Sequence, residues 1–285
     1  EARMEVGGQY RHLFQAAREL FRAEGYEWFG AAGRTVRALL LLENIYWSAV
    51  WLTAYDSEDL DRVGERMYDL LANGVCKPGA EWAPHALPPF APDPTDKQER
   101  ARETYLLAAT RLINRDGYRG VSVGEISAEL NLTKGAFYHH HDAKDDLIVA
   151  CFDRTFEVMR RLQHLAIEQT QNRWEALACV AQALVNHQLS DQGPLMRLAA
   201  LSALPEDIRD DVMKRSDSIS LRFASMISDG VAEGSLRPVD STIAAQMIHS
   251  LLNAAAELDF WVEGLDRERA SRLFSRPMLM GVFTR

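Results

Sequence analysis

The chain has 285 residues, of which 47% are hydrophobic and 26% are charged, a composition that excludes wholesale disorder and fibrous architectures. At about 100–200 residues per domain, this length predicts two domains or one large one. The 32 basic and 41 acidic side chains leave a net charge of −9. This charge argues against a protein that coats nucleic acid or membranes through bulk positive charge, but it is compatible with a small DNA-reading module in an acidic body.

Three helices are predicted ahead of residue 76. Apolar residues at helical spacing, such as Phe14, Ala17 and Phe21, precede Gly25, which is typical of an amphipathic helix and its end. The predicted helices cover Tyr10–Glu24, Ala32–Tyr55 and Ser57–Asn73. Residues 38–55 are the best membrane-span candidate, but a charge such as Glu43 at the centre of a bilayer costs about 3 kcal/mol. We therefore expect a buried helix there and no membrane partner.

The segment 76–96 differs sharply from its surroundings, because it holds six of the ten prolines of the chain. Proline fixes φ and removes a backbone donor, so a regular helix or a central strand is excluded here. The composition predicts an extended linker between two helical bodies.

After the linker the apolar spacing stays helical almost to the end of the chain. The predicted helices are Lys97–Arg115, Val123–Leu130, Lys134–His140, Lys144–Glu168, Trp174–Leu189, Leu195–Ala203, Glu206–Glu233, Thr242–Val262 and Asp266–Phe274. No segment shows the sustained two-residue alternation of a strand. The sequence therefore predicts an all-α protein.

Between Lys97 and Leu147 the local signals agree with one another. Capping boxes begin at Thr95 and at Ser122, and Gly117 ends the helix that lies between them. The three residues 131–133 form a turn, and the helix 134–140 is too short to be stable without packing. Two short helices joined by a tight turn and braced by a longer one predict a helix-turn-helix, whose second helix enters a DNA major groove.

This segment resembles the DNA-binding domain of the tetracycline-repressor (TetR) family of bacterial transcription regulators. The residues that carry the resemblance are Ala108-Ala109, Leu112-Ile113, Gly117-Tyr118, Ser122-Val123, Ile126-Ser127, Leu130, Leu132-Thr133-Lys134-Gly135-Ala136-Phe137-Tyr138-His139-His140-His141, Lys144 and Leu147. Two positions depart from the family pattern, since His141 replaces the usual phenylalanine and Ser127 stands where alanine is commoner.

The resemblance implies a set of DNA contacts that the chemistry also supports. The Thr133 hydroxyl and the amides at the start of that helix can hold phosphate oxygens. Tyr138 and Lys144 offer further contacts to the DNA backbone. Base edges are within reach of Lys134, Ala136 and His139, and Gly135 permits close approach. A metal site at residues 139–141 is not expected, because consecutive helical residues point about 100° apart.

The charge of the module is uneven. Residues 97–119 hold six basic and three acidic side chains, a balance of +3, whereas residues 96–146 as a whole have eight basic and nine acidic ones. We expect a local basic face whose binding to DNA weakens strongly with salt.

The resemblance further implies that the residues after Leu147 form a helical domain for effector binding and dimerisation. Candidate ligand-binding residues are Phe152, Phe156, Trp174, Leu177, His187, Phe223, Met226 and His249. Each of them is also a plausible plain core residue. The expected partners are a palindromic DNA operator, a small hydrophobic effector, and a second protomer or its equivalent within the chain.

A weak repeat relates the two ends of the chain. The pair Glu24-Gly25 lies 209 residues before Glu233-Gly234, and Asn44 lies 209 residues before Asn253. Residues 10–75 therefore resemble the last helices of a TetR-type effector domain. In that family the last two helices pair across a twofold axis, so we expect residues 10–75 to pack on residues 206–262, within or between chains. If they project into solvent with Trp47 exposed, this hypothesis is wrong.

The sequence is thus divided into a helical segment like a dimerisation unit (1–75), a proline-rich linker (76–96), a helix-turn-helix domain (97–146) and an effector-binding domain (147–285). The three cysteines are far apart, which indicates a reducing cytoplasm and neither a disulfide framework nor a metal site. No cofactor is expected. No phosphate loop or nucleophile motif favours an enzyme. The alternative is an interaction module that has kept the fold and lost DNA binding.

Overall fold

The computed structural model describes residues 2–90, 96–129, 144–262 and 264–284. Within these ranges the chain is all-α, as predicted, and its only β-type pairing is a bridge between Cys76 and Leu236. The α-helices are α1 (Ala2–Leu20), α2 (Ala31–Trp51), α3 (Leu60–Asn73), α4 (Lys97–Asp116), α5 (Val123–Glu129), α7 (Lys144–Gln169), α8 (Arg173–Gln188), α9 (Glu206–Ala232), α10 (Ser241–Ala254), α11 (Leu258–Trp261) and α12 (Arg267–Met280). Short 3₁₀ helices are η1 (Leu52–Ala54), η2 (Ser57–Asp59), η3 (Tyr118–Gly120), η4 (Leu198–Ala203) and η5 (Ala255–Glu257).

Most helices lie where the apolar spacing predicts them, although α1 covers Ala2–Leu20 and not Tyr10–Glu24, and two further predictions differ from the structure. The α-helix expected over 195–203 is wrong: the chain is irregular up to Arg197 and then forms η4. The amides of Leu195 and Met196 donate to the side chains of Gln188 and Thr155, so these buried donors are satisfied without a helix. The continuous helix expected over 242–262 is interrupted: α10 ends at Ala254, and the chain continues through the 3₁₀ turn η5 into the short helix α11.

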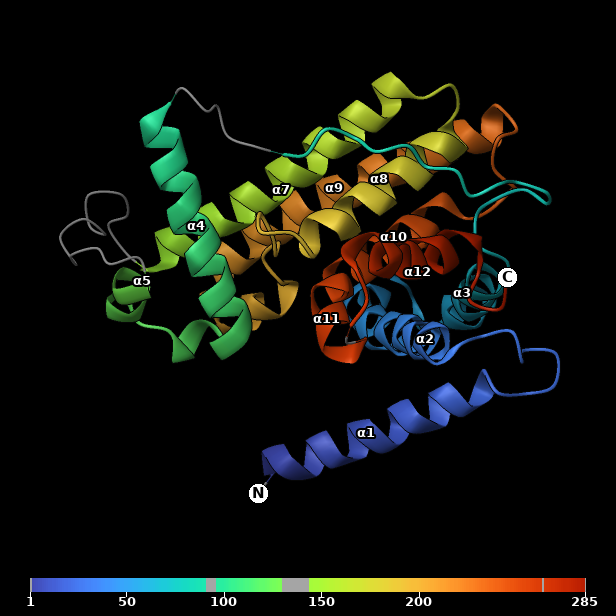
Figure 1. The fold of residues 1–285 in the computed structure, drawn as a ribbon, viewed down its shortest axis with the longest axis horizontal. Helices are drawn as coiled ribbons and strands as arrows, with labels where there is room; N and C mark the ends of the chain where they lie inside the picture. The colour runs from blue at the N-terminus through green and yellow to red at the C-terminus, as the bar shows by residue number, and fades with distance from the viewer. Residues whose placement is uncertain (1, 91–95, 130–143, 263, 285) are drawn as a thin grey trace.

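The long helices α7, α8 and α9 pack against one another and form the body of the protein (Figure 1). The helices α4 and α5 lie at one end of them. Large apolar side chains such as Phe152, Val180 and Phe223 are fully buried in this body. Within the described ranges, no helix is both long and apolar enough to cross a membrane.

The proline-rich segment is extended, as predicted, but it does not separate two bodies. Residues 77–90, called the strap below, run along α8 (Figure 1). Trp174 Nε1 donates to the Glu81 carbonyl at 3.0 Å, the rings of Trp82 and Trp174 lie 6.0 Å apart, and Leu87 is buried. Because α2 and α3 pack against the C-terminal helices, the strap connects two parts of one packed unit.

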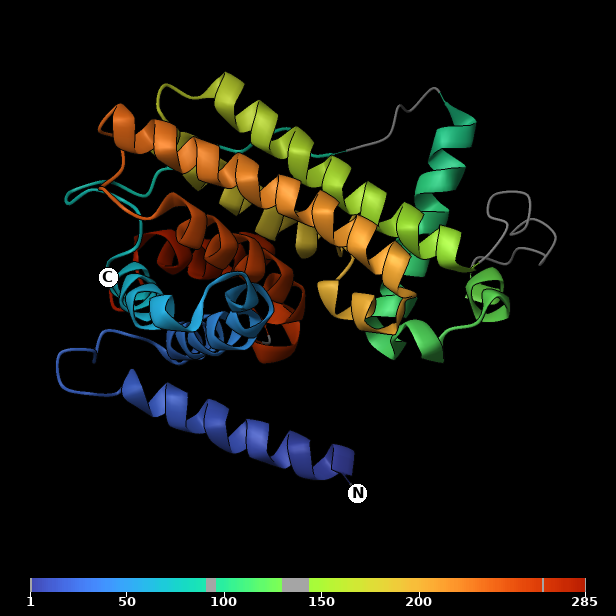
Figure 2. The same ribbon diagram turned by 180° about the vertical axis from the view of Figure 1, so that it is seen from behind.

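The N-terminal helices pack on the C-terminal ones within this chain. Helix α2 lies against α10 and α12, and α3 lies against α10, side by side in both views of the ribbon (Figures 1 and 2). Trp47 and Trp51 are buried, with 8% and 9% of their surface exposed. Helix α1 packs on α2, and its Phe14 stacks on Trp261 at a centroid distance of 4.1 Å. The condition set from the sequence, buried tryptophans on a segment packed against residues 206–262, is therefore met within one chain.

The C-terminal ends of α3 and α12 meet in a reciprocal contact. The Val75 amide donates to the Leu279 carbonyl at 2.8 Å, and the Val282 amide donates to the Leu71 carbonyl at 2.8 Å. Gly74 and Gly281 lie in this contact with φ of +64° and +101°. A Cβ on Gly74 would lie 2.2 Å from the Leu279 oxygen, and a Cβ on Gly281 would lie 2.4 Å from the Ala72 oxygen. We call this junction the seam.

Alanine substitution at the seam is expected to destabilise the protein more than the same change elsewhere. Gly79 is the matched control, because it has a φ of +82° and nothing within 4 Å of its added Cβ. All three substitutions place a Cβ on a residue with positive φ, which costs about 1–3 kcal/mol of backbone strain, and Gly74→Ala and Gly281→Ala add about 1–3 kcal/mol from the overlap. The free energy of unfolding in urea measures the difference. Equal losses in all three variants would contradict the close approach.

Candidate functional site

The first helix of the segment begins at Lys97, as predicted, and ends at Asp116, one residue later than predicted. Its cap is Asp96 and not Thr95, where the predicted capping box begins and which lies outside the described residues. Asp96 caps α4, since its Oδ1 accepts from the amides of Gln98 and Glu99 at 2.8 and 3.0 Å. The apolar face of α4 is buried, including Tyr105 and Ile113. The helix ends at Gly117, whose φ of +76° suits glycine.

The second predicted helix is also present. Ser122 and Glu125 form the expected capping box: the Ser122 amide donates to Glu125 Oε2 at 2.6 Å, and the Glu125 amide donates to Ser122 Oγ at 3.2 Å. Helix α5 follows, and its Ile126 is fully buried. Residues 97–146 are called the reading head below, and residues 147–284 are called the body.

Six of the seven predicted DNA contacts lie outside the described residues. They are Thr133, Lys134, Gly135, Ala136, Tyr138 and His139. The helix predicted over 134–140 and the histidines 139–141 fall there as well.

Lys144, the seventh contact, is described, and its side chain is partly buried at the start of α7. Its ammonium donates to the Tyr118 carbonyl and lies 4.2 Å from the centroid of the Tyr118 ring. Burial lowers the pKa of Lys144. The Tyr118 hydroxyl in turn donates to Asp145. Lys144 therefore holds η3 against α7, a positioning role that the sequence interpretation did not include.

The reading head is joined to the body by a buried arginine. Arg154 of α7 donates from Nε to Glu103 of α4 at 2.7 Å, and from Nη2 to the Gln192 carbonyl at 2.7 Å. The side chains of Arg154 and Glu103 are 2% and 12% exposed. The sequence analysis did not identify this contact. A signal was present, because Cys151 and Val158, three residues before and four after Arg154, are apolar and buried and lie on the same face of α7 as Arg154.

Two further side chains of α4 reach the loop that follows α8. Arg111 donates to the Gly193 carbonyl at 3.0 Å and to the Asp191 carbonyl at 2.6 Å. Asn114 donates to the Leu195 carbonyl at 2.9 Å. Arg111 is one of the six basic residues counted for the basic face, and it stays exposed and charged while its guanidinium is held against this loop. We call these contacts and the Arg154 bonds together the joint.

The eight predicted ligand-binding residues do not line one pocket. Four are plain core side chains with at most 2% exposure, namely Phe152, Leu177, Phe223 and Met226. Trp174 packs under the strap. The remaining three line three different clefts, namely Phe156, His187 and His249.

Two of these clefts involve segments that sequence reasoning did not connect to a ligand. A cleft of about 820 Å³ lies between the strap and α8 and contains His187. A cleft of about 560 Å³ lies between the end of α2, α9 and α10, and His249 lines it together with Trp51 and Tyr55. His249 Nδ1 lies 2.6 Å from Ser220 Oγ. Burial lowers the pKa of both histidines to about 4, so both are neutral near pH 7.

In the part of the chain that the structure describes, no group of three or more His, Cys, Asp or Glu side chains is placed to hold a metal ion. The three cysteines are unbonded, and two of them, Cys151 and Cys179, are buried.

Two family profiles match the chain. Residues 106–151 match the profile of bacterial regulatory proteins of the tetR family. Residues 170–257 match that of the tetracyclin repressor-like C-terminal domain. The first match covers most of the reading head and the start of α7, and the second covers most of the body.

Individual proteins agree with the profiles. The Transposon Tn10 TetC protein of Escherichia coli is 26% identical over 157 residues, which is 54% of this chain and 78% of that protein. An uncharacterized HTH-type transcriptional regulator of Lactococcus lactis subsp. lactis is 27% identical over 162 residues, 53% of this chain and 81% of that protein.

Solved structures share the fold. The TetR family regulator PfmR from Thermus thermophilus superposes with a TM-score of 0.52 at 20% identity and covers 64% of this chain and 99% of its own. AibR, solved in complex with isovaleryl coenzyme A and operator DNA, gives 0.51 at 23% identity, with 63% and 97% covered. A whole chain of this fold thus corresponds to about two thirds of the protein. With the capped helices α4 and α5 joined to a helical body, and with profiles that match both parts, the chain belongs to the TetR family of bacterial transcriptional regulators.

Proposed function

We propose that this regulator is a repressor that binds an operator through its reading head and is released by a small effector bound in its body. The family to which the chain belongs consists of transcriptional regulators, which fits the expectation that the protein is not an enzyme. The observation that carries the proposal is the capped pair α4 and α5, joined to the body by Arg154. These helices brace the segment that would read DNA.

The proposed DNA contacts are those indicated by the sequence: Thr133, Lys134, Gly135, Ala136, Tyr138, His139 and Lys144. Backbone contacts from Thr133 and Tyr138 would position the head, and Lys134 and His139 would read bases. We expect Lys144 to contribute less to DNA binding, because its ammonium already donates to the Tyr118 carbonyl.

A double variant tests the reading head. Lys134→Ala with Tyr138→Phe removes one charged and one neutral contact to DNA, so affinity should fall about tenfold or more. The measurement is a gel shift on the promoter DNA of its own operon, at two salt concentrations. Lys214→Ala is the matched control, because Lys214 is exposed on α9 in the body.

Unchanged affinity in a double variant that unfolds like the wild type would contradict the assigned head. Weak association that does not depend on salt would instead favour the interaction module that has lost DNA binding, because phosphate contacts always bring salt dependence.

We further propose that residues 1–75 form a partial second unit that takes the place of a dimer partner. The internal repeat has a structural counterpart: Asn44 in α2 and Asn253 in α10, 209 residues apart, are both buried. Each donates from Nδ2 to the carbonyl four residues earlier at 3.1 Å, in α2 that of Leu40 and in α10 that of His249.

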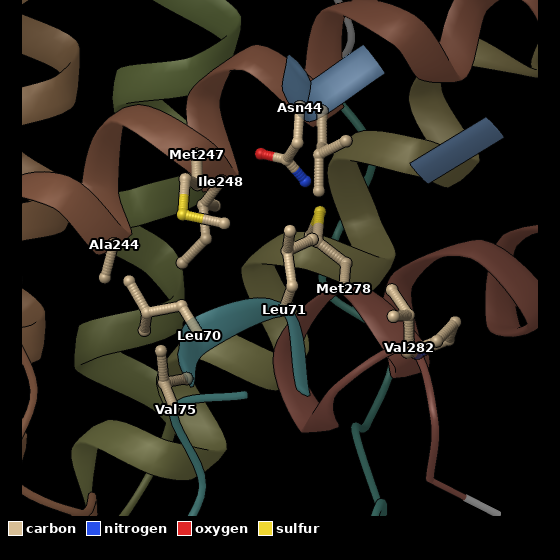
Figure 3. A pocket seen from close by; sticks show the side chains of 11 residues that line it. Asn44, Leu70, Leu71, Val75, Ala244, Met247, Ile248, Met278 and Val282 are labelled. Carbon is tan, nitrogen blue, oxygen red and sulfur yellow. The ribbon is translucent and has the colours of Figure 1, made fainter. Parts of the chain in front are cut away.

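The seam extends this correspondence to α3 and α12. Gly74-Val75 and Gly281-Val282 are 207 residues apart and exchange matching backbone bonds. A small cavity of about 20 Å³ beside the seam is lined by side chains from α2, α3, α10 and α12 (Figure 3). Its lining includes three pairs that are 207 residues apart, namely Leu70 and Pro277, Leu71 and Met278, and Val75 and Val282. These pairs support a pseudo-twofold axis through the seam.

If residues 1–75 fill the pairing face of α10 and α12, two chains have no free copy of that face to share. The chain is therefore expected to run with the mass of one protomer in size-exclusion chromatography with light scattering at micromolar concentration. Two such chains would occupy the two half-sites of a palindrome without pairing through α10 and α12. A stable species with the mass of two chains would contradict this arrangement.

The effector is proposed to be small and partly hydrophobic. AibR, which shares the fold, was solved with isovaleryl coenzyme A, a ligand with a short apolar acyl group. In the present chain the candidate space lies in the clefts next to Phe156, His187 and His249, and not among the packed core residues.

A further inference from the structure

A cleft of about 760 Å³ lies between α4 of the reading head and α7 and α9 of the body. Its volume falls within the range of about 300–1,000 Å³ that is usual for ligand pockets. Five arginines line it, namely Arg102, Arg154, Arg160, Arg215 and Arg222. Four carboxylates also line it, so its side chains carry one more positive than negative charge. The wall of this cleft is therefore unusually rich in guanidinium groups for a protein with a net charge of −9.

The carboxylates of the cleft do not occupy all of its arginines. The cleft carboxylates form three ion pairs, namely Arg154 with Glu103, Arg160 with Glu157, and Arg215 with Asp153. Arg215 also pairs through Nε with Asp211, outside the cleft, at 3.2 Å. Arg222 donates from Nε to the amide oxygen of Gln163 at 3.1 Å, which is a neutral acceptor. Arg102 forms no ion pair with any residue that the structure describes. Two cations are thus left without a carboxylate partner of their own.

Two of the guanidinium groups also carry buried donors that lack an acceptor. Arg154 is held by Glu103 and the Gln192 carbonyl through Nε and Nη2, but its Nη1 is buried with no hydrogen-bond partner in the described part of the chain. Arg215 contacts Asp153 through Nη1, and its Nη2 is likewise buried without a partner. A buried charged donor without an acceptor is unfavourable, so both atoms favour an anion in the cleft.

We propose that this cleft binds the oxyanion group, a phosphate or a carboxylate, of an organic effector. Guanidinium groups bind both anions in the same forked geometry, which lysine does not offer. The apolar part of such a ligand has a surface to lie on, because Phe90, Leu106, Phe156 and Ile219 line the same cleft. The site is distinct from the strap cleft at His187 and from the cleft at His249.

The position of the site suggests how the ligand acts, and this step rests on the proposed repressor function. Arg154 links Glu103 in the reading head to the Gln192 carbonyl in the body. An anion that draws on the same guanidinium competes with Glu103 and loosens the joint. Because binding free energies are coupled reciprocally, the ligand weakens DNA binding and DNA weakens ligand binding by the same factor.

Calorimetric titration of the full chain tests the site with three probes: pyrophosphate, coenzyme A and octanoate. The variant is Arg215→Gln with Arg222→Gln, which leaves the Arg154 joint intact. The matched control is Arg209→Gln on the same helix, since Arg209 lies outside the cleft and makes only distant pairs of 3.9 and 4.0 Å. We expect at least one probe to bind, and its affinity to fall about tenfold or more in the double variant and to stay unchanged in the control.

The probes distinguish the source of the anion. Binding of coenzyme A or pyrophosphate assigns a phosphate-bearing ligand, and binding of octanoate alone assigns a carboxylate. The proposal is overturned if no probe binds in the millimolar range, or if the double variant binds as tightly as the wild type. Gel shifts with and without the bound probe then test the repressor function separately from the binding site. Arginine-dependent binding in a chain that does not bind DNA would keep the site and overturn only the repressor function.

Discussion

The buried bond between Arg154 and Glu103 is the interaction on which the arrangement of head and body depends. Its two side chains come from α7 and α4 and are 2% and 12% exposed. A buried ion pair stabilises a structure only when the remaining donors and acceptors are satisfied, and removal of one partner is strongly destabilising. Here Arg154 Nη1 is left without an acceptor. The Arg154–Glu103 pair therefore holds α4 of the head against α7 of the body, while Nη1 of Arg154 stays available to an anion.

The seam between α3 and α12 is built from different chemistry and has a different consequence. Its central contacts are backbone bonds from Val75 and Val282, and two glycines allow the two segments to approach closely. Arg237 and Arg37 add side-chain bonds to it, to the Gly74 and Val282 carbonyls, both at 2.8 Å. The joint between head and body depends on charged side chains instead. The molecule thus has two kinds of junction. The seam is made largely of backbone bonds, and the joint is made of charged side chains to which a ligand could bind.

Much of the fold could be predicted because its signals are local. The capping box of Ser122 and Glu125 and the helix end at Gly117 depend on neighbouring residues only, and both are present as predicted. The path of the strap along α8 and the irregular segment before η4 could not be predicted, because both depend on tertiary hydrogen bonds of Trp174 and Gln188. For the same reason the predicted ligand residues were chosen by apolar character, and four of the eight are packed in the core. The arginines of the cleft went unnoticed because a charged residue is normally read as exposed.

The seam and the joint together restrict how an effector could act on DNA binding. In a regulator whose bodies pair across a twofold axis, a ligand can change the separation of two reading heads. If residues 1–75 fill the pairing face within the chain, as proposed, no second body is fixed against the first, and the ligand does not control the separation of two heads. The quantity that a ligand can still change is then the angle between one reading head and its own body. That angle is held by Arg154, Arg111 and Asn114, and the arginine cleft opens beside the first of these.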